Sequence, residues 1–131
     1  APAPQVVATL DARRGELYAA AHRGDDPLAP PLWGPAVVAI EALAARLAAE
    51  TGSVVVAGEG AGLLEAAVGP GAGRLRFLGP PAGAPDAAWV GRLGAALLAR
   101  GVGIAAADLA PVYVRRAEAE VRRTGARFEP A

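Results

Sequence analysis

Few residues in this chain have side chains that could carry out catalysis. The sequence contains no cysteine, one histidine, His22, and one serine, Ser53. The lack of cysteine removes thiolate nucleophiles, disulfides and thiolate metal sites. His22 is not part of an HExxH-like zinc motif, and Ser53 is not in a GxSxG nucleophile turn. The sequence therefore predicts a protein that is not an enzyme and holds no metal or cofactor.

A glycine-rich turn is the one motif that could approach a nucleotide. Gly58, Gly60 and Gly62 follow an apolar, β-branched run and precede a helical stretch. Backbone amides at such a turn can cradle a phosphate. The spacing is GxGxG rather than GxGxxG, no acidic residue ends the next strand, and the P-loop lysine is missing. We expect a tight strand-to-helix turn, with cofactor binding at these three glycines as the weaker alternative.

Charged residues gather in the segment DARRGELY, which contains Asp11, Arg13, Arg14, Glu16 and Tyr18. Two interpretations remain open for this segment. The two acids could hold Arg13 or Arg14 in local ion pairs, each worth at most about 1 kcal/mol. Alternatively, the segment could form a contact surface for a partner. Tyr18 is expected to pack inward with its hydroxyl at the rim.

The carboxy-terminal segment begins with PVYVRR, which contains Tyr113 and Arg115. It could be an arm that packs back on the domain, or a strand that docks on a neighbouring domain or subunit. The last ten or so residues are expected to be disordered. Tyr113 and Arg115, with Asp11, Arg13, Glu16 and Tyr18, are the candidate interaction residues.

Hydrophobic periodicity indicates five strands and three helices. Two strands flank Gly15, which is suited to a positive φ at a hairpin turn. Pro35 favours an edge position for the third strand, and Asp86 is placed to cap the last helix. The last helix carries Val90, Leu93, Leu97 and Leu98 on one face. The predicted strands cover 5–10, 16–22, 32–38, 53–57 and 74–78, and the predicted helices cover 40–50, 63–68 and 86–100.

This order of elements predicts an α/β fold with a mixed five-stranded sheet and flanking helices. It is the order of one lobe of the actin-like, or ribonuclease-H-like, fold. Residues 1–107 are expected to form that lobe, and residues 108–131 a carboxy-terminal arm.

Composition narrows the classes of partner. The 13 basic residues balance 13 acidic residues, so no net field attracts tRNA or an anionic membrane. No apolar run reaches the length of a membrane span, and the start APAPQVV does not resemble an export signal. We therefore expect a cytoplasmic protein that does not grip tRNA directly.

Three segments occur together in a fixed order: DARRGELYAA at 11–20, VVAGEGA at 55–61 and PVYVRRAEAE at 111–120. Together they resemble the second half of the TsaB (YeaZ) family, which acts in threonylcarbamoyladenosine biosynthesis on tRNA. The resemblance implies an actin-like, two-lobed protein of which this chain is the carboxy-terminal lobe. The AIDTS-like and GPGSFTGLR-like segments of the family's first lobe do not occur here. About a hundred further residues are therefore expected upstream in the intact gene.

The resemblance also implies a function and partners. Family members are non-catalytic scaffolds that support the TsaD-type transferase, which binds metal and transfers the threonylcarbamoyl group, while a TsaE-type ATPase joins the assembly. The first lobe provides most of the contact with the transferase, so a lobe that lacks it should lose or weaken that association. Without that lobe an apolar face would be exposed, which favours a homodimer. The older glycoprotease label implies a peptidase, for which the chain has no recognisable nucleophile.

The runner-up interpretation belongs to a different class. In it, the chain is the nucleotide-binding half of an actin-like kinase or ATPase, and the GEGAG turn at 58–62 contacts the nucleotide.

Overall fold

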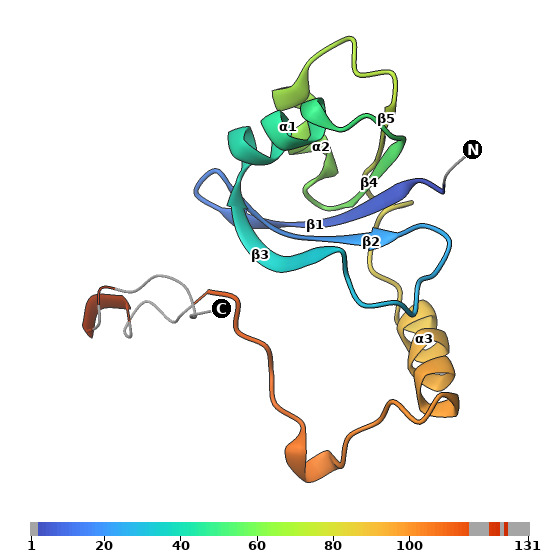
Figure 1. The fold of residues 1–131 in the computed structure, drawn as a ribbon. Coiled ribbons are helices and arrows are strands. Elements are labelled where there is room, and N and C mark those ends of the chain that lie inside the picture. Colours follow the sequence, from blue (N-terminus) through green and yellow to red (C-terminus); the bar gives the residue numbers. More distant parts are fainter. Residues whose placement is uncertain (1–2, 116–120, 124, 126–131) are drawn as a thin grey trace.

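The computed structural model describes residues 3–115, 121–123 and 125 of the chain (Figure 1). It confirms the predicted α/β class with a mixed five-stranded sheet and flanking helices. The expected disorder of the last ten or so residues falls mostly outside the described residues. The elements are β1 Gln5–Arg13, β2 Glu16–Arg23, β3 Trp33–Ala39, α1 Ile40–Ala49, β4 Val54–Gly58, α2 Ala61–Val68, β5 Leu75–Leu78, α3 Ala87–Ala99 and the 3-10 helix η1 Ala106–Asp108.

The strands lie in the order β3-β2-β1-β4-β5. β1 and β2 form the predicted antiparallel hairpin, in which Leu10 lies opposite Tyr18. β4 pairs in parallel with β1 on one side and with β5 on the other, as its apolar sequence on both faces predicts. Pro35 lies in β3, which is an edge strand, so its missing N–H breaks no central ladder.

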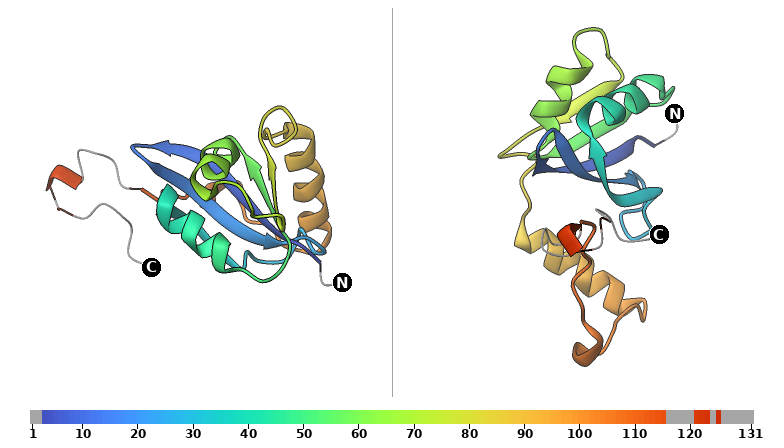
Figure 2. Two further views of the ribbon diagram at one scale, coloured as in Figure 1. Left: turned by 90° about the horizontal axis from the view of Figure 1, so that it is seen from above. Right: turned by 90° about the vertical axis from the view of Figure 1, so that its left-hand side faces the viewer.

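Both helices that connect parallel strands cover the same face of the sheet (Figures 1 and 2). β3 and β4 run in the same direction, as do β4 and β5, and the chain advances across the sheet in one direction through α1 and α2. Right-handed crossovers therefore place both helices on one side. The core lies between these helices and the sheet and includes Val7, Leu17, Ala19, Ala21, Leu43, Leu47, Val54, Val56, Ala61 and Leu64.

The opposite side of the sheet is not covered in this way. Because side chains alternate along a strand, the neighbours of the core residues point away from α1 and α2. We call this side the open face and define it by Ala8, Leu10, Tyr18, Ala20, Pro35 and Ala57, none of which is buried.

α3 lies on the side of the open face, and its ends are well defined (Figure 2). Asp86 caps it as predicted, since its Oδ1 accepts a hydrogen bond from the backbone N–H of Ala88 at 2.8 Å. At the other end Gly101 has a φ of 74°, and the N–H of Val102 donates to the carbonyl of Leu97 at 2.9 Å. This is the Schellman arrangement that ends many helices.

The predicted apolar face of α3 is present but does not pack on the sheet. None of the residues of α3 is buried, and Val90 and Leu98 are 68% and 67% exposed. Helical periodicity therefore identified the element but not its environment. None of the helices in the described part of the chain has the length and apolar character that a membrane span requires.

Candidate functional site

The turn between β1 and β2 holds a run of left-handed backbone. Arg13, Arg14 and Gly15 have φ values of 64°, 57° and 77°. Only glycine adopts this region without steric cost, so the two arginines need local support. Asp11 supplies it, because its carboxylate accepts from the backbone N–H of Arg13 at 2.7 Å and pairs with the guanidinium at 3.0 Å. This pair confirms the local ion-pair interpretation for Asp11 and Arg13.

Arg115 of the carboxy-terminal segment docks on the same hairpin. Its guanidinium pairs with the carboxylate of Glu16 and donates to the backbone carbonyl of Ala12 at 2.8 Å. It also lies over the ring of Tyr18, 5.7 Å from the ring centre. The side chains of Arg115 and Glu16 are only 23% and 18% exposed, so solvent screens this pair less than an open surface pair. At Arg115 the segment therefore behaves as an arm that packs back on the domain.

The structure thus brings five of the six candidate interaction residues together. We call Asp11, Arg13, Glu16, Tyr18 and Arg115 the hairpin cluster. Tyr113 lies outside it and is 68% exposed on the arm. The partner expected for Glu16 was wrong: it pairs with Arg115, 99 residues away, rather than with Arg13 or Arg14. Only the fold could reveal this pair, because no local spacing predicts it.

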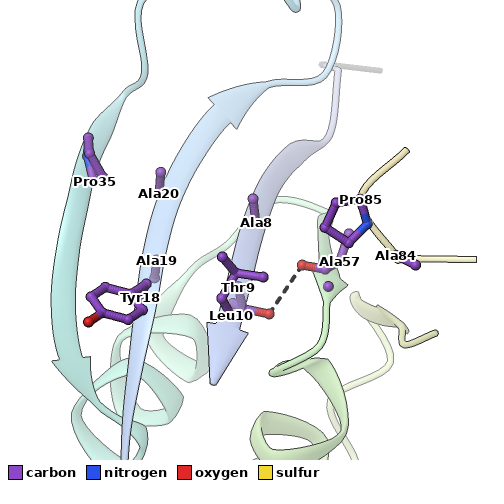
Figure 3. A pocket seen from close by; sticks show the side chains of 12 residues that line it. Ala8, Thr9, Leu10, Tyr18, Ala19, Ala20, Pro35, Ala57, Ala84 and Pro85 are labelled. Atoms are coloured by element: carbon purple, nitrogen blue, oxygen red, sulfur yellow. Dashed lines mark hydrogen bonds between the residues drawn. The ribbon is translucent and has the colours of Figure 1, made fainter. Parts of the chain in front are cut away.

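The expected inward packing of Tyr18 was also wrong. Leu17 is fully buried on the side of α1 and α2, and the alternation of β2 places Tyr18 on the open face. There the ring lies beside a hollow (Figure 3). The guanidinium of Arg115 lies over the ring.

The glycine-rich turn is explained by close packing of the backbone. Gly58 has a φ of 121°, and a Cβ there would collide with the carbonyl oxygen of Thr9. A Cβ at Gly60 would lie 2.6 Å from a methyl group of Leu17. Gly62 has no such constraint, since no atom lies within 4 Å of its Cβ position. Gly58 and Gly60 are therefore explained by the close approach of Thr9 on β1 and Leu17 on β2 to the turn, independently of any ligand.

The loop before α3 covers the start of this turn. Gly83 packs so tightly that a Cβ there would collide with the carbonyl of Leu78 and lie 2.6 Å from the backbone nitrogen of Gly58. The loop therefore packs closely against the backbone of Gly58. This arrangement favours the structural interpretation of the turn over cofactor binding.

A hollow of about 360 Å³ lies on the open face and is walled at one end by this loop (Figure 3). No charged side chain lines it. The hydroxyl of Thr9 is already used, because it donates to the carbonyl of Ala57 at 3.1 Å. Such a lining suits apolar groups rather than a phosphate or a metal ion. No group of three or more metal-ligating side chains is assembled anywhere in the described residues.

A pair of glycine substitutions tests the structural role of the turn. Gly58→Ala should lower the free energy of unfolding by about 3 kcal/mol, because it combines backbone strain with a steric collision. Gly62→Ala, four residues later, should be neutral or stabilise α2 by up to about 1 kcal/mol. Urea denaturation of both variants measures the difference. Equal effects would contradict the packing explanation.

A double-mutant cycle tests the anchor of the arm. Glu16→Gln and Arg115→Ala should show a coupling of about 1 to 2 kcal/mol in urea denaturation, since the pair is partly buried. The exposed pair of Arg23 and Asp25 is the control and should show weaker coupling. There the hydrogen bond from Arg23 lowers the pKa of Asp25. The small stabilisation by the Arg23–Asp25 pair is therefore present above the pKa of Asp25 in the unfolded chain, and it is lost as the pH falls through the lower pKa of Asp25 in the folded protein. Equal coupling in the two cycles would argue against an anchor.

No protein-family model matches the chain, and no curated protein matches it at a significant level. The TsaB-family resemblance therefore rests on the segments at 11–20, 55–61 and 111–120 and stays a prediction.

Proposed function

We propose that this chain is the second, non-catalytic lobe of a TsaB-type protein, which supports a TsaD-type transferase in the threonylcarbamoyladenosine modification of tRNA in the cytoplasm. The observation that carries the proposal is the contact between Arg115 and the hairpin. Arg115 belongs to the third segment of the resemblance, and Glu16 and Tyr18 belong to the first. Two segments that resemble the same family and also contact each other in the structure support the family proposal more strongly than two segments that lie apart.

The topology supports the same proposal. The chain forms three strands and then a helix, a strand, a helix, a strand and a helix, and the strands lie in the order β3-β2-β1-β4-β5. This arrangement is compatible with one lobe of the actin-like fold. Many functions share such folds, so the topology limits the architecture and does not select the activity.

The tip of the hairpin is the surface that we assign to the transferase. Asp11 neutralises Arg13, and Arg115 neutralises Glu16, so the cluster is largely balanced. Arg14 is exposed at the tip and has no ion-pair partner among the described residues. Its backbone adopts the left-handed conformation, with a φ of 57°. A partner with an acidic group at this position would gain a charge-assisted contact.

Binding to a TsaD-type transferase tests this assignment. In calorimetric titrations the chain should bind more weakly than a full-length family member. Arg14→Glu should weaken binding about tenfold or more, because it replaces attraction by repulsion. Arg76→Glu, an exposed charge change on β5, is the matched control and should leave the affinity unchanged. Equal loss in both variants would contradict an interface at the hairpin, and affinity of this chain equal to that of the full-length family member would contradict the assignment of most of the contact to the first lobe.

Titration with ATP or ADP separates this proposal from the nucleotide-binding alternative. Because the loop at Gly83 packs against the backbone of Gly58 and no charged side chain lines the neighbouring hollow, we expect no binding heat at millimolar nucleotide. Saturable binding that Gly62→Arg abolishes would instead favour the half of an actin-like kinase or ATPase. Gly62→Ala serves as the control for that substitution.

A further inference from the structure

The hairpin surrounds the guanidinium of Arg115 with three different kinds of acceptor. The carboxylate of Glu16 pairs with it, and the backbone carbonyl of Ala12 accepts a hydrogen bond from it at 2.8 Å. The centre of the Tyr18 ring lies 5.7 Å from its central carbon. An arginine can satisfy all three, because its donors diverge in a plane whose face stacks on a ring, whereas the lysine ammonium is a compact point charge. The hairpin therefore selects a guanidinium.

A bulge in β1 provides the carbonyl acceptor. The register of β1 against β2 shifts between Asp11 and Arg13, so Ala12 has no partner across the hairpin. A bulged residue leaves backbone groups outside the ladder of the sheet. The carbonyl of Ala12 can therefore accept from a side chain, although the residue itself is only 4% exposed. The pairing of β1 with β2 forms this acceptor, and the arm does not.

The segment that delivers Arg115 to the hairpin buries little of its own surface. Every residue of 101–113 is exposed, and Leu109 and Val112 are 73% and 80% exposed. Withdrawal of Arg115 would uncover none of the core, which lies on the other side of the sheet. Contacts at the end of such a segment open at a lower free-energy cost than the core does. Arg115 can therefore leave the hairpin while the domain stays folded.

A different protein, rather than a second copy of this chain, is the occupant that can replace Arg115. The arm of a second copy offers the same arginine but lacks the effective concentration, on the order of millimolar, that a tether within the chain provides. A different protein can add contacts that the arm does not make. Arg14 in the same turn is exposed and has no ion-pair partner among the described residues. An acidic group beside the incoming arginine would pair with it.

We propose that the hairpin is a binding site for an arginine side chain of a partner protein, and that Arg115 occupies this site until the partner binds. The exchange replaces one guanidinium by another. Glu16, whose side chain is only 18% exposed, keeps a cationic partner in both states, so no partly buried charge is left unpaired. The inference does not depend on the proposed function, because it requires an arginine and not a transferase.

Titration with a short peptide tests the exchange. The probe is the acetylated and amidated pentapeptide PVYVR, the sequence of 111–115, whose arginine fits the site in the structure. NMR titration follows the backbone amide signals of residues 12–18. The peptide should bind Arg115→Ala at least about tenfold more tightly than the unmodified chain, in which the tethered arginine competes.

Three controls examine the chemistry of the site. A peptide with lysine in place of arginine should bind Arg115→Ala about tenfold more weakly or worse, because it lacks the planar fork. Glu16→Gln, added to Arg115→Ala, should abolish binding. Glu41→Gln, an exposed change on α1 in the same background, should leave the affinity unchanged.

Arg115→Gln provides a second chain without the tethered guanidinium and should show the same gain in affinity. Equal affinity of the peptide for the unmodified chain and both variants would overturn the proposal. Equal binding of the lysine peptide would overturn it too, since that would show a general attraction to Glu16. The absence of binding to both variants would leave Arg115 as a fixed structural anchor. A dimer of the unmodified chain that Arg115→Ala dissociates in sedimentation would instead assign the site to the arm of a second copy.

Discussion

The one-sided packing of the sheet determines most other features of this structure. Right-handed crossovers through α1 and α2 in the same direction place both helices, and hence the whole core, on one face. Every strand residue between two core residues must then point to the other side. The hollow, the position of Tyr18 and the unpaired state of α3 all follow from this arrangement.

Arg115 connects the two ends of the described chain. It contributes an ion pair, a hydrogen bond and a ring contact to a hairpin about a hundred residues earlier. A single planar guanidinium can make all three contacts because its donors diverge in a fixed plane. The arm and the hairpin are therefore one surface, and this surface joins two of the three segments on which the family resemblance rests.

The glycine-rich turn shows how a motif can be explained by packing within the fold. Gly58 and Gly60 make room for Thr9 and Leu17, and the loop at Gly83 packs against the backbone of Gly58. These contacts explain Gly58 and Gly60 without a ligand.

The sequence by itself determined the elements and the class of the fold. Alternation and helical periodicity depend on neighbours a few residues apart, so the strands, the edge position of Pro35 and the cap at Asp86 could all be predicted. The side on which Tyr18 lies, the partner of Glu16 and the exposure of α3 depend on the packing of segments distant in sequence. Only the tertiary structure decided these, because local patterns do not specify which faces of distant segments meet.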